Sequence, residues 1–203
     1  NGTESVTGRQ FADAYLLKLD SDGNITWEKT IGGNKGSLAR DIQQTSDGGY
    51  IIVGAVWNYL DLGTEWDVYL IKTDENGNKT WEKAFDLFGM SENDWAWSVQ
   101  QTSDGEYIIA GWTLAYVSTR LDDAFLLKTD ANGNKLWEKN YGGDDIEDTR
   151  SAQQTFDGGY MIAGWTSSFN STKPEDQNSY LVKTDANGNK LWERAIDAFD
   201  KQE

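Results

Sequence analysis

Carboxylates are the side chains in this sequence with the greatest capacity for chemistry. The 203 residues include 34 Asp and Glu but no His and no Cys. A Ser-His-Asp triad, a His-ligated zinc or haem and thiolate chemistry are therefore excluded within the chain. Two close carboxylates can still hydrolyse a glycosidic bond. Candidate acids in polar connections are Glu92, Asp94, Asp144, Asp145, Glu147 and Asp148.

Because acids are so abundant, any pair of them is unremarkable. No pair is singled out, and no catalytic residue is assigned. A carboxylate-dependent glycoside hydrolase, or another carbohydrate-active enzyme, is kept as an alternative to the binding function argued below.

A second possible chemistry is calcium binding at a turn that recurs along the chain. The segment Asp20-Ser21-Asp22-Gly23-Asn24 resembles the start of a calcium loop, in which alternate oxygens point at the ion. No copy of the turn is followed by the bidentate Glu that an EF-hand requires. We therefore expect a hairpin turn held by Asp and Asn side chains bonded to their own backbone. No cofactor is expected, and calcium is the alternative.

Tryptophans outside the repeated pattern are the candidates for ligand binding. They lie in or beside the connections between predicted strands, or end strands at matching places, and connections carry function more often than the scaffold does. Flat aromatic rings beside Asp and Asn are typical of sugar-binding surfaces. The alternative is local packing of long loops. The predicted ligand-binding residues are Trp57, Trp66, Trp95, Trp97, Trp112 and Trp165, with Tyr59 and Tyr116 near them.

These residues are positioned by a repeat that covers nearly the whole chain. One segment, exemplified by DAFLLKTDANGNKLWEK, starts at Asp13, Asp67, Asp123 and Asn178. Its tryptophans, spaced 54, 56 and 55 residues apart, are Trp27, Trp81, Trp137 and Trp192. A second segment, exemplified by SAQQTFDGGYMIAGWT, occurs three times between those copies. Fixed register over such lengths indicates a structural repeat.

Each segment predicts a β-hairpin, because Asn-Gly and Asp-Gly are strong turn signals. Runs such as YIIVGAV are apolar without alternation, which is typical of strands covered on both faces. Two hairpins give four strands in about 55 residues, the pattern of a β-propeller blade. The sequence thus predicts one all-β repeat domain over 1–203. It comprises a half blade at 12–31 and three full blades at 38–86, 95–141 and 148–196. A β-solenoid is the rival, but its repeats are usually shorter. The in-phase tryptophans are expected to fill the wedges between blades.

The two segments together resemble the repeats of large secreted or cell-surface propeller proteins of archaea and bacteria. The stretch D-x-N-G-N-x-x-W is also similar to the tryptophan-docking motif of quinoprotein-type propellers. The resemblance implies the fold and an extracellular or cell-surface setting, and it carries no catalytic motif to this chain.

Net charge and hydrophobicity limit the kinds of partner that the chain can have. A net charge of −16 repels phosphate backbones, so no nucleic-acid partner is expected. No apolar run reaches the length of about 20 residues that a membrane helix needs, so no membrane span is expected. The predicted function is an extracellular binding, adhesion or structural module whose partner is a polysaccharide or another protein chain.

The number of predicted hairpins leaves the ring of blades incomplete. Four copies of the first segment and three of the second make three and a half blades, whereas closure normally takes four or more. We expect further blades or oligomerisation to complete the ring. The chain is then a piece of a longer protein, or a subunit of a surface assembly or filament.

Overall fold

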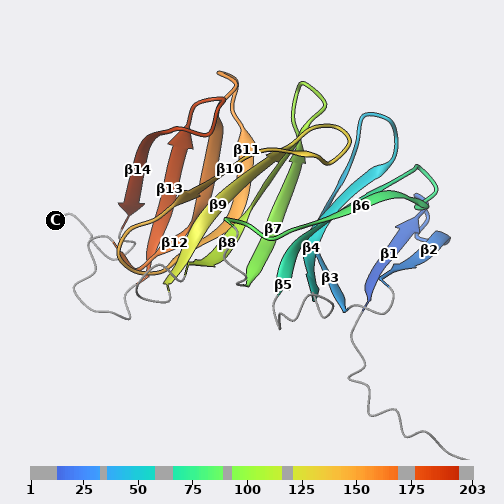
Figure 1. The fold of residues 1–203 in the computed structure, drawn as a ribbon. Coiled ribbons are helices and arrows are strands. Elements are labelled where there is room, and N and C mark those ends of the chain that lie inside the picture. Colours follow the sequence, from blue (N-terminus) through green and yellow to red (C-terminus); the bar gives the residue numbers. More distant parts are fainter. Residues whose placement is uncertain are drawn as a thin grey trace, which may run out of the picture.

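The fold is built from β-strands throughout (Figure 1). The computed structural model describes residues 13–32, 36–57, 66–88, 93–115, 121–168 and 177–196. Within these ranges the chain forms fourteen strands and no helix, which confirms the all-β prediction. The described residues accordingly hold no helix with the length and apolar character of a membrane span.

The strands pair antiparallel, in chain order, into four sheets. The first sheet is β1-β2, the second β3-β4-β5-β6, the third β7-β8-β9-β10 and the fourth β11-β12-β13-β14. Their bounds are β1 (Ala14–Leu19), β2 (Ile25–Ile31), β3 (Ser37–Gln44), β4 (Tyr50–Trp57), β5 (Trp66–Thr73), β6 (Lys79–Phe85), β7 (Asp94–Gln101), β8 (Tyr107–Ala115), β9 (Leu121–Thr129), β10 (Lys135–Tyr141), β11 (Glu147–Gln154), β12 (Tyr160–Thr166), β13 (Asn178–Thr184) and β14 (Lys190–Ile196).

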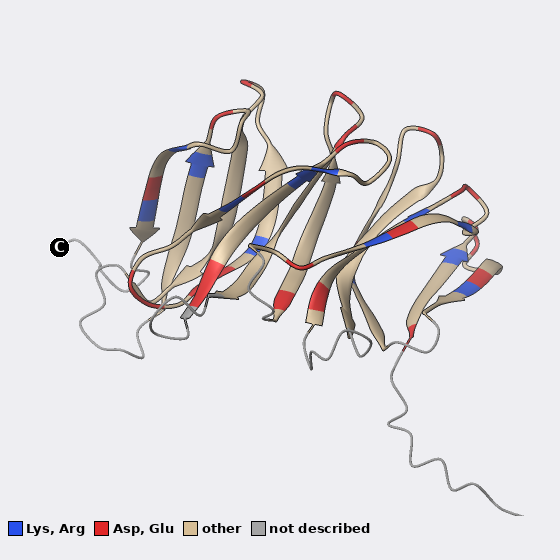
Figure 2. Ribbon diagram, viewed as in Figure 1, with Lys and Arg blue, Asp and Glu red and all other residues tan. Residues whose placement is uncertain are grey.

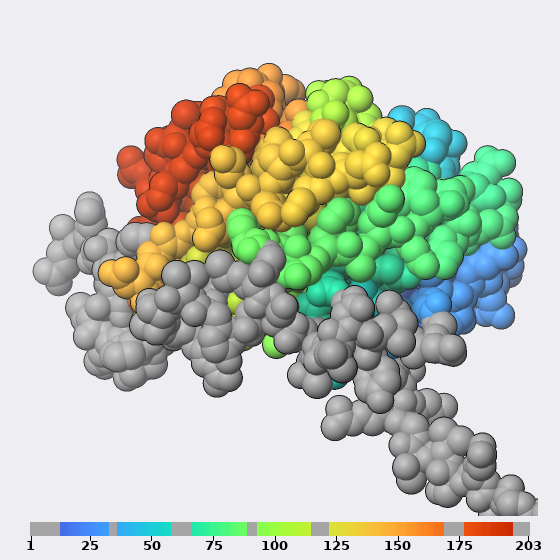
Figure 3. Space-filling model, in the orientation of Figure 1, coloured from blue at the N-terminus to red at the C-terminus, as the bar shows by residue number. Residues whose placement is uncertain are grey.

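The sheets follow one another in chain order across the molecule (Figures 1 and 3). The first and fourth sheets lie at opposite ends of this array (Figure 1). Strand β7 contacts both β3 and β11, so the first strand of each four-stranded sheet faces the first strand of the next. We call β3, β7 and β11 the inner strands.

The predicted hairpin turns form because glycine occupies a left-handed position in each. Gly77 has φ +74°, and its equivalent Gly23 has φ +83°; a side chain there would be strained. In the first turn the Asp20 carboxylate accepts hydrogen bonds from the backbone N–H groups of Asp22 and Asn24, both at 2.9 Å. The turn is therefore held by its own side chains.

Apolar side chains fill the space between successive sheets. Leu16 of the first sheet packs with Tyr69 and Ile71 of the second. The other two interfaces are built in the same way, with Leu70 and Phe125 buried between the second and third sheets. Strands β4 and β5 are buried along almost their whole length, because they are covered on both faces.

The prediction that all four in-phase tryptophans are core residues is wrong for one of them. Trp27, Trp81 and Trp137 pack against the clusters between sheets. Trp192 is 41% exposed. The physical reason is its position on β14, in the last sheet of the array, where no further sheet among the described residues covers it.

Glutamines tie the inner strands together and explain the repeated Gln-Gln pair. The backbone N–H of Gln101 donates to the side-chain oxygen of Gln43 at 2.6 Å. The N–H of Gln154 donates to Gln100 at 2.7 Å. The side chain of Gln101 in turn accepts from the N–H of Ser46 at 2.8 Å. These bonds fix the spacing and register of the strands that carry the site.

Candidate functional site

One residue bulges out of each inner strand near its start. The pairing register shifts between Ala39 and Asp41, between Ala96 and Ser98, and between Thr149 and Ser151. The extra residues are therefore Arg40, Trp97 and Arg150. A β-bulge redirects a side chain, and here three bulges at equivalent places direct three side chains toward one another.

A glycine opposite each bulge allows the strands to approach. A β-carbon at Gly111 would overlap the backbone carbonyl of Trp95. Gly54 and Gly164 meet the bulged strands of their own sheets in the same way. These are the glycines that the sequence places inside apolar strands, and close backbone approach is why a side chain is excluded there.

The three bulged side chains form a stack. The Trp97 ring lies between two guanidinium groups, with the Arg40 Cζ 4.4 Å and the Arg150 Cζ 4.1 Å from its centroid. Both arginines are exposed and Trp97 is half-buried. At exposed sites such cation–π contacts stabilise by about 0.5–1 kcal/mol each. They hold two positive charges in place at this end of the inner strands.

Four further indoles continue from this stack as a row across two sheets. Arg40 also lies 5.3 Å from the ring of Trp95. Trp95 stacks on Trp112 with ring centroids 6.1 Å apart and contacts Trp66 of the second sheet at 5.1 Å. Trp66 meets Trp57 edge-on at 5.3 Å. We call Trp57, Trp66, Trp95 and Trp112 the tryptophan row; all four are half-buried.

The sixth predicted tryptophan joins the cluster through a carboxylate. Trp165 on β12 pairs in register with Asp148 on β11. Asp148 forms an ion pair with Arg150 at 2.6 Å. Burial raises the pKa of Asp148 to about 6, although Arg150 and a hydrogen bond from Trp165 oppose the rise. The fold thus brings five of the six predicted residues into one aromatic cluster and places Trp165 at its edge.

A second buried carboxylate lies at the start of β7, next to the tryptophan row in sequence. Asp94 is 1% exposed. Its Oδ2 accepts a hydrogen bond from the backbone N–H of Leu87 at 2.8 Å, and no described residue bonds its Oδ1. Burial raises its pKa to about 7, against hydrogen bonds from Thr113 and Leu87 that lower it.

The other predicted carboxylates do not form an obvious catalytic pair. Glu147 and Asp148 are adjacent on β11, so their side chains leave opposite faces of the sheet. Glu147 is fully buried and accepts hydrogen bonds from Thr166 and from the N–H of Gly143. Gly143 lies in the connection between the third and fourth sheets. Glu92, Tyr59 and Tyr116 lie outside the described residues.

In the recurring turn, the Asp carboxylate accepts hydrogen bonds from other residues of the same turn. In the copy at Asp130, the carboxylate accepts bonds from the N–H groups of Asn132 and Asn134 and from the Asn134 side-chain amide. These bonds lower the pKa of Asp130. The residues that the structure describes include no group of three or more acids placed to hold a metal ion.

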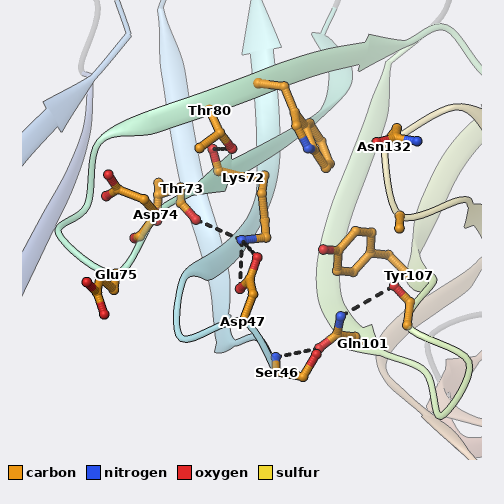
Figure 4. Close-up of a pocket in the computed structure, with 13 residues that line it drawn as sticks. Ser46, Asp47, Lys72, Thr73, Asp74, Glu75, Thr80, Gln101, Tyr107 and Asn132 are labelled. Carbon is orange, nitrogen blue, oxygen red and sulfur yellow. Dashed lines mark hydrogen bonds and ion pairs between the residues drawn. The ribbon is translucent and has the colours of Figure 1, made fainter.

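A separate groove of about 570 Å³ opens between the second and third sheets at the turn end of the strands (Figure 4). The buried Lys72 ammonium bonds the Asp47 carboxylate at 2.8 Å and the Thr73 carbonyl at 2.8 Å, as Figure 4 shows. The bond from Lys72 holds the pKa of Asp47 down at about 2. Lys183 pairs with Asp157 in the fourth sheet in the same manner. Because all three four-stranded sheets repeat the ion pair, we interpret it as structural.

Comparisons with known proteins bear on the fold. No family model matches the sequence, and no curated protein matches it. A protein of unknown function from Bacteroides caccae has a similar structure, with a TM-score of 0.55 at 12% identity over 90% of this chain and 57% of that one. A mutant of the Synechocystis apocarotenoid oxygenase gives a TM-score of 0.48 at 10% identity, over 91% of this chain and 45% of that one. The chain therefore spans little more than half of the first protein.

Sequence reasoning missed the two arginines of this site. Arg40, Trp97 and Arg150 occupy equivalent places, each directly before the start of the second repeated segment at Asp41, Ser98 or Ser151. Aligning the three copies of that segment would have shown that Arg, Trp and Arg alternate at one position of an otherwise uniform repeat.

Proposed function

We propose that the sheets are blades of a β-propeller and that the chain is an extracellular or cell-surface module that binds a neutral polysaccharide. The binding surface is the tryptophan row together with the Arg40–Trp97–Arg150 stack. The observation that carries the proposal is the gathering of these seven side chains from three different sheets. The setting outside the cell rests on the resemblance of the repeat.

Local packing alone explains this surface less well than binding does. The repeat uses one tryptophan per sheet for packing between sheets, and those rings lie elsewhere. Most of the tryptophan row departs from the repeat: the position of Trp95 is Leu38 in the second sheet and Asp148 in the fourth. Its rings are half-buried rather than enclosed. Large aromatic rings left partly open beside polar groups fit a binding surface.

The polar groups around the rings favour sugar hydroxyls as the ligand chemistry. Carboxylates and guanidinium groups both bond hydroxyls, the first as acceptors and the second as donors. Acids gather at this end, where β5, β7 and β9 begin (Figure 2). With a net charge of −16, this field disfavours anionic chains. A neutral polysaccharide therefore suits the surface better than an acidic one.

Titration with soluble polysaccharides tests the proposal. Tryptophan emission is measured while neutral glucans, mannans and xylans are added, with polygalacturonate as the acidic comparison. We expect a saturable change with at least one neutral polymer and none with polygalacturonate. Arg40→Ala should weaken binding about tenfold, the usual effect of losing one charged hydrogen bond. Lys79→Ala, which removes a cation on the outer strand β6, is the control.

Trp95→Ala is a second site variant, and Trp192→Ala is its control because that tryptophan lies outside the cluster. Emission that stays flat with every polymer would overturn the proposal. So would binding that Arg40→Ala and Trp95→Ala leave unchanged.

One observation favours the glycoside hydrolase as a second candidate function. Asp94 and Asp148, whose pKa values burial raises to about 7 and about 6, begin inner strands at the end that carries the cluster. A raised pKa is what a general acid needs at neutral pH. Release of reducing ends from a bound polymer, abolished by Asp148→Asn, would establish hydrolysis in place of simple binding.

A further inference from the structure

Each sheet docks on the next through one tryptophan and one turn. A β-carbon at Gly77, in the turn of the second sheet, would lie 2.8 Å from the Trp27 ring of the first sheet. In the same way, a β-carbon at Gly133 would lie 2.7 Å from the Trp81 ring, and one at Gly188 would lie 2.8 Å from the Trp137 ring. The indole thus lies flat on a turn where only glycine leaves room.

A cation accompanies each of these tryptophans. Lys83 and Lys139 each stand two residues after the tryptophan, and their side chains reach the same turns, with the lysine Cγ 3.1 Å from a β-carbon built on the turn glycine. Hydrogen bonds within the turn lower the pKa of the aspartate that opens it, and the charges of these lysines, with that of Lys29 in the first sheet, lower it further. A docking contact therefore consists of an indole on the glycine and a cation beside the aspartate.

This series of contacts has a free member at each end of the described array. Trp192 is 41% exposed, and Arg194, in the place of the accompanying lysine, is exposed as well. At the other end, no described residue comes within 4 Å of a β-carbon built on Gly23. Asp20 opens that turn. The fourth sheet thus presents the tryptophan and cation, and the first sheet presents the glycine and aspartate.

The exposed apolar faces of the fourth and first sheets also correspond to the two sides of an interface within the chain. Between the first and second sheets, Leu16 and Ile31 pack on Tyr69 and Ile71. The repeat places Ile196 of the fourth sheet where Ile31 stands, and it is 48% exposed. It places Tyr15 and Leu17 of the first sheet where Tyr69 and Ile71 stand, and they are 57% and 46% exposed. These end faces are therefore the two halves of an interface that the chain already forms three times.

We propose that the fourth sheet of one copy of this chain docks on the first sheet of a second copy, with Trp192 on the Asp20–Asn24 turn and Arg194 beside Asp20. The contact is heterologous, because different surfaces meet. It therefore builds either a closed ring or an open filament, according to the rotation at each contact. Covering the exposed apolar residues drives it. This assembly is independent of polysaccharide binding.

The two surfaces are disabled separately. Trp192→Ala removes the ring that docks. Gly23→Asn fills the site where it would lie, and asparagine is among the residues that tolerate the left-handed backbone. Two controls make comparable changes outside the proposed contact. Leu191→Ala truncates an exposed side chain (59% exposed) of the same strand. Gly105→Asn changes another turn glycine, which has φ +84°, and no described residue lies within 4 Å of a β-carbon built there.

Sedimentation velocity over a range of concentrations gives the readout. The unaltered chain and both controls should associate as concentration rises. Trp192→Ala and Gly23→Asn should each weaken association by about 30-fold or more, as loss of an interface hot spot does. Mixed together, these two variants retain one good surface of each kind. They should form a one-to-one dimer and nothing larger.

The mixing experiment separates this contact from other modes of association. A chain that stays monomeric at every concentration overturns the proposal, and so does association that survives both variants. A mixture of the two variants that stays monomeric overturns the head-to-tail pairing.

Discussion

Replacing the buried Asp94 by Asn should make the protein more stable at neutral pH and remove part of its pH dependence. Burial raises the pKa of Asp94 to about 7, whereas an Asp in the unfolded chain titrates near 3.9. Between these values the folded protein keeps the proton and the unfolded chain loses it. Unfolding therefore releases a proton, and stability falls as pH rises through this window.

The size of the effect follows from the width of the window. A full proton difference changes the unfolding free energy by about 1.4 kcal/mol per pH unit. Over roughly three units this sets a ceiling of about 4 kcal/mol for Asp94. Asn keeps the shape of the protonated acid and its oxygen can still accept from the N–H of Leu87, but it carries no charge.

Urea unfolding followed by tryptophan fluorescence at pH 4.5, 6 and 7.5 measures the effect. The unaltered protein should lose stability across this range. Asp94→Asn should flatten the slope and should be the more stable of the two at pH 7.5. Asp144→Asn removes a carboxylate from an exposed connection and should leave the slope unchanged. If Asp94→Asn has the slope of the parent, or is less stable at pH 7.5 while equal at pH 4.5, the account of Asp94 is refuted.

The other predictions concern the repeat itself. Gly111→Ala should destabilise the protein by about 1–3 kcal/mol, the usual result of overpacking, because the added carbon meets the carbonyl of Trp95; the urea midpoint checks this. Trp137→Ala should destabilise by about 3 kcal/mol, the low end for loss of an aromatic side chain, because Trp137 is half-buried against the cluster between sheets. The equivalent but exposed Trp192→Ala should change the midpoint of the dilute chain little. At acid pH the sign reverses. Hydrogen bonds, mainly from Lys72 and from Thr155, lower the pKa values of Asp47 and Asp157 to about 2. Both carboxylates therefore stabilise the fold above about pH 4 and lose that contribution as pH falls toward 2. Circular dichroism in an acid titration should show unfolding in this range, and at a higher pH in Lys72→Met.

Much of the secondary structure can be predicted from the sequence because its determinants are local. The Asp-Gly turn at Gly23 and the Asn-Gly turn at Gly77 require positive φ, and a hairpin follows from that requirement alone. The apolar runs around Ile52 and Ile109 indicate strands covered on both faces, and both residues are buried. Repetition then extends one correct unit along the chain.

The site could be predicted only in part, because its members come from different sheets. The tryptophans were recognisable because most of them break the repeat and the other two end strands at matching places. The arginines were not, because an isolated Arg40 or Arg150 in a polar stretch reads as an ordinary solvated charge. Only the bulges of the inner strands bring both against Trp97.

The sequence by itself determined the hairpins, the repeat length and the tryptophans that depart from it, since these depend on backbone preferences and spacing within one unit. The tertiary structure decided which repeated residues keep their partners. Trp137 and Trp192 stand in the same local sequence, NKLWE, yet one is covered by the next sheet and the other is exposed. Burial depends on the neighbour across the interface, and no local pattern records whether that neighbour is there.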